Sequence, residues 1–372
     1  MKFTISKNVI DNNIDFLCSY NDNNDAFVPY RGIYFKIDAD KLVLISAKNN
    51  LAARIIINVD EKDLSVDEAG IFLISSNILR TIIKKMDNRI TFESYGQNIK
   101  IYDKTTKYTL TQLNSDSYPF INFDLKKNQF TIKSKILEEA INNVSISTSQ
   151  GTNERLTALL YKCINIKNTD INKLRLTATD SFRLSSLLIN INKEININVI
   201  VEAKNLKKLI FKDMPEEIVV FFDEEKIGIS ANNLVIFTNL TKLNYLDINN
   251  FITPVFSKTL SIEKEEFLKL INKVVFYNSD KVRRLSFFIN QEELKLSFEV
   301  PELGISQAST KNITYNGKPL EMDIDFQFIK DAVSVLPNGK IYLKINETND
   351  RIFVLSDENK NHIQLITPIR RY

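Results

Sequence analysis

The apolar and polar positions of the chain repeat a composite pattern three times. Residues 3–17, 130–144 and 260–274 each open with two apolar residues separated by one polar residue. Each segment then continues with apolar residues at helical spacing. Alternation is typical of a strand, and spacing of three to four residues is typical of one helix face. Each segment is therefore predicted to be a short strand that leads directly into a helix.

The three segments align without gaps, at offsets of 127 and 130 residues. Their matching apolar positions are Phe3 with Phe130 and Leu260, Ile5 with Ile132 and Ile262, Ile10 with Leu137 and Phe267, Ile14 with Ile141 and Ile271, and Leu17 with Val144 and Val274. A fixed period of this kind indicates internal duplication. We therefore expect three structurally equivalent units.

A second helical pattern follows in each unit, over residues 76–86, 204–214 and 326–336. Aligned without gaps, it places Ile78 with Leu206 and Phe328, Ile82 with Ile210 and Ala332, and Met86 with Met214 and Leu336. Further strands are expected at Ile33–Ile37, Leu42–Ile45, Arg54–Val59, Arg89–Phe92, Leu174–Thr179, Ile218–Phe221, Leu285–Ile289, Leu294–Phe298 and Ile341–Leu343. The predicted fold is α+β, with three strand-rich domains of two helices each at 1–125, 126–254 and 255–372.

Composition removes several classes of site. His362 is the single histidine, so sites that need two histidines are excluded; the two cysteines, Cys18 and Cys163, form no CxxC pair, which argues against a cysteine-based zinc site. The eight glycines form neither of the common phosphate-binding loops. We expect no cofactor, no metal and no catalytic residue. No apolar segment resembles a signal peptide or a membrane span, so we expect a cytoplasmic protein without a membrane partner.

A net charge of +3 means that any binding to nucleic acid depends on where the cations lie. On the predicted helices, basic residues recur at one-face spacing: Arg80 and Lys84; Lys204, Lys207, Lys208 and Lys212; Lys269 and Lys273. Lysines in such rows can hold phosphates without reading bases. A solvated helix face would give the same pattern.

Two segments carry a resemblance to a known family. Leu176–Leu184 reads LTATDSFRL, and the chain ends in LITPIRRY, Leu365–Tyr372. With the threefold repeat and the opening MKFTI, the whole chain resembles the bacterial DNA polymerase III beta subunit, the sliding clamp family. The resemblance implies a non-catalytic processivity factor for a DNA-directed DNA polymerase. Two chains would form a head-to-tail homodimer, closed as a ring around duplex DNA, with helices facing the DNA.

The resemblance also implies a pocket that binds peptides of the replicative polymerase and of the clamp loader. By position it comprises Leu156, Thr179, Ser181, Phe182, Arg183, Leu184, Leu246, Phe251, Leu365, Thr367, Pro368 and Ile369. The family usually has Gly-His at Ser181-Phe182 and Pro at Leu246, so the preferred peptide is expected to differ. In the dimer, Tyr108 on an edge strand of the first domain would lie near Phe276 and Tyr277 of the third.

Two other functions remain open at this point. Asp180, Asp223 and Asp247 could gather a divalent cation in a nuclease, although no carboxylate cluster stands at the strand ends of the motif region. A monomeric repeat adaptor that binds proteins but not DNA would share the fold. The Asp180–Arg183 segment could be a purely structural turn, and Tyr108, Phe276 and Tyr277 could be core residues. His362, just before the last predicted strand, is expected to be a surface residue.

Overall fold

The computed structural model describes residues 1–60, 62–125, 128–149, 151, 156–252, 255–279 and 281–370, apart from the side chains of residues 156 and 157. The described residues form two compact units. One unit comprises Met1–Ser134 and Lys208–Leu240, and the other comprises Lys135–Lys207 and Thr241–Tyr372. The predicted domain boundaries at 125/126 and 254/255 adjoin residues outside the described part.

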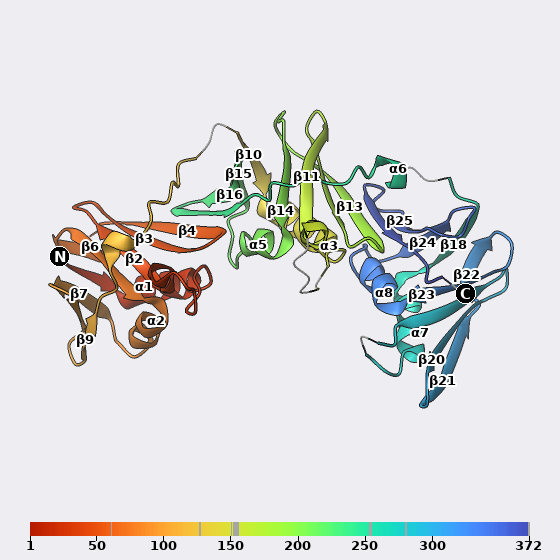
Figure 1. The fold of residues 1–372 in the computed structure, drawn as a ribbon, viewed down its shortest axis with the longest axis horizontal. Helices are drawn as coiled ribbons and strands as arrows, with labels where there is room; N and C mark the ends of the chain where they lie inside the picture. The colour runs from red at the N-terminus through yellow and green to blue at the C-terminus, as the bar shows by residue number, and fades with distance from the viewer. Residues whose placement is uncertain are drawn as a thin grey trace. The chain divides into compact units, whose positions relative to one another are not determined.

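Each repeat consists of two halves, and each half contains in order a strand, a longer helix and three strands, with β5 and β22 as additional strands between the halves of the first and third repeats (Figure 1). The first repeat contains β1 (Lys2–Ser6), α1 (Lys7–Leu17), η1 (Val28–Arg31), β2 (Gly32–Ile37), β3 (Lys41–Lys48), β4 (Leu51–Asn58), β5 (Leu64–Glu68), β6 (Gly70–Ser75), α2 (Ser76–Lys84), β7 (Arg89–Tyr95), β8 (Asn98–Tyr102), β9 (Lys107–Thr111) and η2 (Ser115–Ser117).

The second repeat contains β10 (Gln129–Lys133), α3 (Ser134–Ser145), α4 (Leu156–Leu160), β11 (Cys163–Asp170), β12 (Lys173–Thr179), β13 (Arg183–Asn190), β14 (Asn198–Glu202), α5 (Ala203–Lys208), β15 (Glu217–Phe222), β16 (Lys226–Ala231), β17 (Leu234–Asn239) and α6 (Asn249–Ile252). The third contains β18 (Lys258–Glu263), α7 (Lys264–Val274), β19 (Arg284–Ile289), β20 (Leu294–Val300), β21 (Gly304–Thr310), β22 (Ile313–Asn316), β23 (Leu320–Asp325), α8 (Phe326–Ser334), β24 (Lys340–Ile345), β25 (Ile352–Ser356) and β26 (His362–Ile366).

Strand registers confirm the threefold repeat. The first strand of each repeat pairs antiparallel with the strand that follows the second helix, and equivalent residues meet. The pairs are Ile5 with Ile90, Ile132 with Ile218, and Ile262 with Ile341. All six of these side chains are buried. The predicted α+β fold with three repeated, strand-rich domains is therefore confirmed.

The sequence alignment matched the first and third of the second helices correctly and misplaced the middle one by one position. Leu79, Leu206 and Ile329 are the buried equivalents, whereas Ile78 is 49% exposed and Phe328 is only partly buried. The middle helix is also shorter than expected, because α5 ends at Lys208. Asp213 has φ of 61°, a left-handed conformation that an α-helix cannot continue through.

Two sheets continue from one repeat into the next. In the first unit, β17 pairs with β4 and joins four strands of the second repeat to four of the first. In the second unit, β26 pairs with β13 and joins the second repeat to the third. Each joint pairs two strands, β4 with β17 or β13 with β26, and each of these strands is the last one of its half-repeat. Among the described strands, the four sheets end at eight strands, and two of these end strands are β9 and β21.

The core of the first repeat is aromatic. Phe3 stacks on Phe92 with ring centroids 4.9 Å apart, and Phe35 stacks on Phe72 at 4.4 Å. All four rings are fully buried. Burial of rings of this size dominates the stabilisation of a core. In the described part of the chain, no helix combines the length and the apolar character that a membrane span requires.

Candidate functional site

The LTATDSFRL segment forms the turn between β12 and β13. Asp180 Oδ1 accepts hydrogen bonds from the amides of Phe182 and Arg183, both at 3.0 Å. Thr179 Oγ1 donates to the Arg183 carbonyl at 2.7 Å and accepts from the Ser181 amide at 3.2 Å. Ser181 has φ of 80°, a conformation that favours glycine. The polar side chains of the motif therefore hold an unfavourable turn in place.

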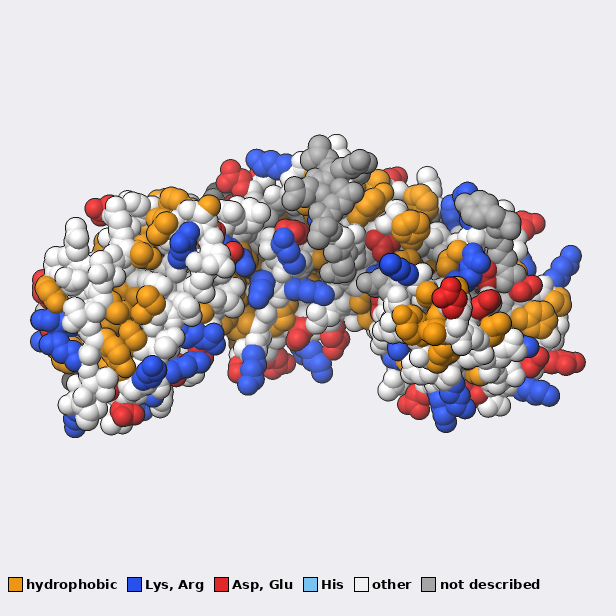
Figure 2. Space-filling model, turned by 60° about the horizontal axis from the view of Figure 1, so that its bottom comes forward, with side chains coloured by type: hydrophobic (Ala, Val, Ile, Leu, Met, Phe, Trp, Pro, Cys, Tyr) orange, Lys and Arg blue, Asp and Glu red, His pale blue; other side chains and the backbone are white. Residues whose placement is uncertain are grey.

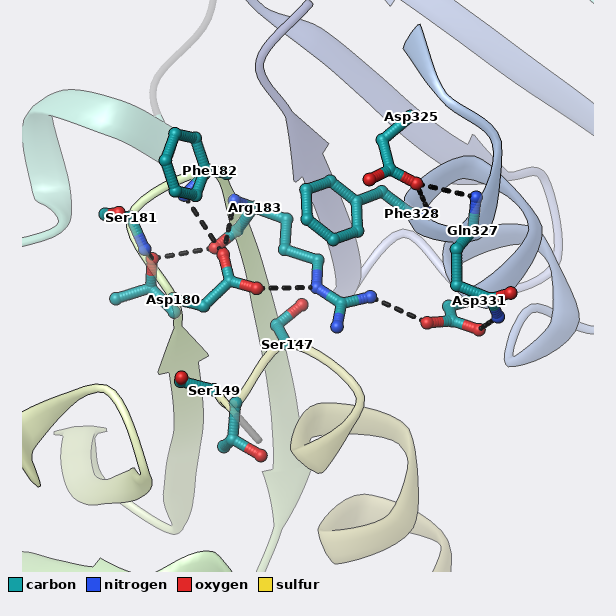
Figure 3. A network of polar contacts seen from close by, with 12 residues as sticks. Ser147, Ser149, Asp180, Ser181, Phe182, Arg183, Asp325, Gln327, Phe328 and Asp331 are labelled. Carbon is teal, nitrogen blue, oxygen red and sulfur yellow. Dashed lines mark hydrogen bonds and ion pairs between the residues drawn. The ribbon is translucent and has the colours of Figure 1, made fainter. Parts of the chain in front are cut away.

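Arg183 connects this turn to the third repeat (Figure 3). Its Nε donates to Asp180 Oδ2 at 2.9 Å, and its Nη1 donates to Asp331 Oδ2 on α8 at 2.7 Å. The guanidinium also lies over the ring of Phe328, 4.4 Å from the centroid. Gln327 holds the other carboxylate oxygen of Asp331 at 2.6 Å. The Arg183 side chain is only 11% exposed, so its two carboxylate partners and the ring replace most of its hydration.

An apolar cluster lies beside the turn at the joint between β13 and β26. Its buried members are Leu184, Ile248, Phe353 and Leu365. The side chains of Ile252, Phe256, Leu355 and Ile363 pack against it. Tyr245 anchors the segment before α6, because its hydroxyl donates to the Thr177 carbonyl of β12 at 3.2 Å. The cluster is the apolar base of this candidate site.

The C-terminal segment is fixed to both repeats. The amide and the hydroxyl of Thr367 both donate to the Phe182 carbonyl at 2.9 Å. Two residues later, the amide of Ile369 donates to the Asp323 carbonyl at 2.7 Å. Pro368 lies between these anchors. The segment therefore forms a fixed edge of the site.

Large apolar side chains remain accessible around this base. Phe182 is 61% exposed, Leu246 is 46% exposed and Phe251 is 45% exposed. Arg351 lies over the Phe251 ring at 5.2 Å. Such exposure of rings beside a buried apolar cluster is typical of a surface that binds another chain.

The structure therefore brings together most of the predicted pocket residues. Hydrogen bonds, backbone pairing or shared burial connect Thr179, Ser181, Phe182, Arg183, Leu184, Leu365 and Thr367. The side chain of Leu156 lies outside the described residues. Leu246 and Phe251 flank Ile248, which the sequence analysis missed together with Phe353, Phe328 and Asp331. Ile248 lies between two predicted residues, but no sequence pattern links Asp331 to Arg183, 148 positions earlier.

The predicted DNA-facing cations differ in their partners. Asp15 on α1 receives Arg80 Nε at 2.6 Å and Lys84 Nζ at 3.2 Å, and these ion pairs hold the Asp15 pKa below its usual value despite partial burial. Lys204 pairs with Glu202 at 2.8 Å. Within the described part of the chain, the exposed side chains of Lys207, Lys208, Lys212, Lys269 and Lys273 form no ion pair.

Lys212 lies apart from the helix on which it was expected. It is exposed in the turn after α5, contrary to the prediction of one helix face, because α5 ends four residues earlier.

On the face shown in Figure 2, Lys and Arg side chains lie interspersed with Asp and Glu. A surface of this kind attracts phosphates locally and weakly.

The three residues predicted for the dimer contact are not core residues. Tyr108 is partly buried on β9, while Phe276 and Tyr277, just after α7, are 50% and 42% exposed. Phe276 makes an edge contact with the buried ring of Phe298 at 5.7 Å. Leu303 and Ile305, at the β21 edge, are each 63% exposed. Among the described strands, both sheet edges leave one side of the backbone unpaired, and both carry accessible apolar side chains.

His362 is buried, which corrects the expectation of a surface residue. It is the first residue of β26, a strand with neighbours on both sides, and it is 1% exposed. Its Nε2 lies 2.6 Å from the side-chain nitrogen Nε2 of Gln364, and Ser185 Oγ donates to Gln364 Oε1 at 2.5 Å. Ser147 extends this buried chain, with its Oγ 2.6 Å from Ser185 Oγ. Burial lowers the His362 pKa to about 4.

The nuclease alternative gains no geometric support. Asp180 is engaged by Arg183 and by two backbone amides. Over the ranges that the structure describes, no three His, Cys, Asp or Glu side chains are grouped so that they could hold a metal ion.

Comparison with known proteins was made at the level of family, sequence and fold. Residues 1–122, 131–247 and 252–370 match the N-terminal, central and C-terminal domains of the DNA polymerase III beta subunit. The chain is similar to the beta sliding clamp of Mycoplasmopsis pulmonis, with 26% identity over 94% of both chains. It is also similar to that of Bacillus subtilis, with 23% identity over the full length of both.

Solved structures agree in fold. The DNA polymerase sliding clamp of Bacillus subtilis superposes with a TM-score of 0.93 at 20% identity, covering 100% of both chains. A Pseudomonas aeruginosa sliding clamp bound to griselimycin superposes with a TM-score of 0.89 at 16% identity, again over both complete chains.

Proposed function

Because the chain belongs to the DNA polymerase III beta subunit family, the beta sliding clamps, we propose that it encircles duplex DNA and tethers the replicative polymerase. It is a non-catalytic processivity subunit. Its partners are duplex DNA, the polymerase subunit that carries out synthesis, the clamp loader and a second copy of the same chain. We place this activity in the cytoplasm, where a bacterial chromosome is replicated.

Retention by a ring does not require a tight grip. A closed ring stays on DNA through topology, so its inner surface needs only weak, non-specific attraction to phosphates, which permits sliding. A net charge of +3, with exposed lysines on helices of each repeat, suits this requirement. We assign Arg80, Lys84, Lys204, Lys207, Lys208, Lys212, Lys269 and Lys273 to the DNA-facing surface.

The construction of the two internal joints supports ring closure. At the first joint, Ala53 faces Ile236, and the Ile56 amide donates to the Asn233 carbonyl at 3.0 Å. At the second joint, Ser185 faces Gln364, and the amide of Leu188 donates to the carbonyl of Asn361 at 3.0 Å. The two joints use equivalent strands in the same register.

A third joint of the same kind requires a second chain. Six strands end a half-repeat; four are paired in the two internal joints, and β9 and β21 remain. Each of these strands also pairs with the strand before it, and these pairs show which residues are equivalent. Tyr108 of β9 lies opposite Ile101, just as Ile236 of β17 lies opposite Ile229 and Gln364 of β26 lies opposite Val354. In the same way, Ser306 of β21 lies opposite Phe298 on the preceding strand, just as Ser185 of β13 lies opposite Ala178 and Ala53 of β4 lies opposite Ser46.

These equivalences favour one register for the dimer. Tyr108 is the counterpart of Gln364, and Ser306 is the counterpart of Ser185. Tyr108 therefore lies opposite Ser306 of the partner subunit, close to the partner's Phe276 and the partner's Tyr277. Two such joints, related by a twofold axis, close a head-to-tail ring of six domains. This repeated joint is the observation that carries the proposal.

The site at the joint of β13 and β26 is proposed to bind partner peptides. An extended peptide would place apolar anchors on the base formed by Leu184, Leu365 and Ile248, between the exposed rings of Phe182 and Phe251. Leu156, Thr179, Ser181, Arg183, Leu246, Thr367, Pro368 and Ile369 complete the assignment. One pocket per chain would give a ring two tethering points.

Retention on circular DNA tests this function. The protein is loaded with a clamp loader and ATP onto a nicked plasmid, and free protein is removed by gel filtration. We expect the ring to stay on the circle and to be lost when a restriction enzyme linearises the plasmid, because a ring can slide off an end. Equal release before and after cutting would contradict encirclement.

A further inference from the structure

The carboxylate of Asp15 lies between the two cations of the first repeat that are assigned to the DNA-facing surface. Asp15 lies on α1, and Arg80 and Lys84 lie one turn apart on α2, which packs beside α1. Both cations contact the same carboxylate, one on each oxygen, at 2.6 and 3.2 Å. Two adjacent cations that converge on one anion are the arrangement by which proteins hold a backbone phosphate.

The other repeats carry the cation but not the carboxylate. The aligned first helices place Asn142 and Asn272 at the position of Asp15. The buried faces of the second helices place Lys207 and Lys330 at the position of Arg80, since Leu79, Leu206 and Ile329 are equivalent. Neither lysine forms an ion pair with any residue in the described ranges. Among the described residues, only the first repeat therefore supplies an internal anion at this position.

The ion pairs of Asp15 are accessible to exchange. The three side chains are 38% to 48% exposed, and ion pairs at such sites are weak and screened by salt. A phosphate can therefore displace the carboxylate, but it must also overcome the carboxylate's repulsion. Lys207 and Lys208, which have no such competitor within the described part of the chain, bind phosphate without this opposition.

We propose that Asp15 competes with DNA phosphates for Arg80 and Lys84, so that the first repeat holds DNA more weakly than the second and third. This inference rests on the proposed function. Asp15 is thus a positioning residue: it keeps the two cations side by side and limits their hold on the backbone. The consequence is a ring with an uneven grip, in which the region around α1 and α2 slips most easily along the duplex.

The test compares the full-length protein with Asp15→Asn, which gives the first repeat the amide of the other two. Asp67→Asn is the matched control, because Asp67 is an exposed acid of the same domain, paired with Lys2 on the sheet. Binding to a fluorescent DNA duplex is measured by anisotropy over a range of salt concentrations. We expect Asp15→Asn to bind about fivefold more tightly at low salt, with a log–log salt slope steeper by about 1 to 2, because two cations become available to phosphates.

A second variant tests whether the tighter DNA binding of Asp15→Asn comes from Arg80 and Lys84. Adding Arg80→Gln and Lys84→Gln to Asp15→Asn should abolish the tighter binding and the steeper slope. Equal salt dependence of Asp15→Asn and Asp67→Asn, with salt-dependent binding by the unaltered protein, would overturn the inference alone. A gain that survives loss of both cations would overturn it too. Absence of salt-dependent binding by every variant would overturn the assignment of these cations to a DNA-facing surface as well, whereas the retention assay tests encirclement itself.

Discussion

The carbonyl oxygen of Phe182 accepts two hydrogen bonds from Thr367, one from its amide and one from its hydroxyl, each 2.9 Å long. This contact joins the β12–β13 turn to the C-terminal segment, 185 positions away. Both sides of the proposed pocket are therefore positioned before any peptide arrives. A preformed site binds with less loss of conformational entropy than one that must order itself.

Phe182→Ala should weaken peptide binding without disturbing the ring. The side chain of Phe182 is 61% exposed, so its loss removes contact area for a ligand and little of the protein's own packing. We expect the affinity for a polymerase-derived peptide to fall about tenfold or more, as for other aromatic anchors at interfaces. Isothermal titration calorimetry measures this affinity.

Ile171→Ala is the matched control, because Ile171 is 65% exposed in the β11–β12 turn of the same unit, away from the motif. It should leave peptide affinity unchanged. Dissociation of the Phe182→Ala protein into monomers would contradict the assignment of this residue to the pocket.

Arg183→Ala should destabilise the second unit. It removes the partner of Asp180 and Asp331, two partly buried carboxylates, and the cation over Phe328. Loss of one member of such a network costs about 2–4 kcal/mol of unfolding free energy. Arg183→Lys should restore only part of this, since an ammonium cannot make two directed bonds and stack at once.

Urea unfolding of the three proteins measures the effect. If Arg183→Ala unfolded at the same urea concentration as the unaltered protein, the network shown in Figure 3 would not contribute to stability.

Acidification should destabilise the joint of β13 and β26 through His362. Burial lowers the pKa of this histidine to about 4, whereas an unfolded chain binds the proton near its ordinary value of 6.5. Protonation therefore favours the unfolded state below that value. Stability is fully present above about pH 6.5 and is lost as the pH falls toward 4, by up to about 3 kcal/mol.

His362→Leu should remove this part of the pH dependence, because leucine carries no group that titrates. Leucine suits this position, since the equivalent residue in the other internal joint is Leu234. Unfolding is followed by urea titration at several pH values between about 4 and 7, the range in which the histidine titrates. Parallel pH profiles for the two proteins would exclude His362 as the source of the slope.

Lys207→Glu combined with Lys208→Glu should weaken clamp loading, so that loading fails at a lower salt concentration. Both lysines are exposed at the end of α5 and form no ion pair among the described residues, so the change replaces two phosphate contacts with two repulsions. Loading onto nicked circular DNA is measured across a salt series. Lys311→Glu with Lys318→Glu, near β22, changes the charge equally and should have no such effect; equal loading by the two variants would refute the DNA-facing assignment.

The repeat, the fold class and the strand–helix order could be predicted from sequence, because each depends on a local apolar period such as that of Ile10, Ile14 and Leu17. Features that depend on contacts between residues far apart in the sequence could not be predicted in this way. His362 is buried because β26 gains β13 as a neighbour. The middle of the second helices was misplaced by one position because α5 begins at Ala203, one residue before the aligned segment, and gives way to an irregular turn after Lys208. Likewise, nothing near Arg183 in the sequence indicates Asp331.

Disulfide formation between Tyr108→Cys and Ser306→Cys tests the ring most directly. In the internal joints the equivalent residues face each other between hydrogen-bonded pairs, where side chains lie closest and a disulfide can form. The background carries Cys18→Ser and Cys163→Ser, and Thr106→Cys with Ser306→Cys is the control displaced by two residues. The account predicts rapid, specific cross-linking between the two introduced cysteines of different subunits, seen as a covalent dimer on a non-reducing gel. A monomeric product, or cross-linking no faster than in the displaced pair, would contradict it.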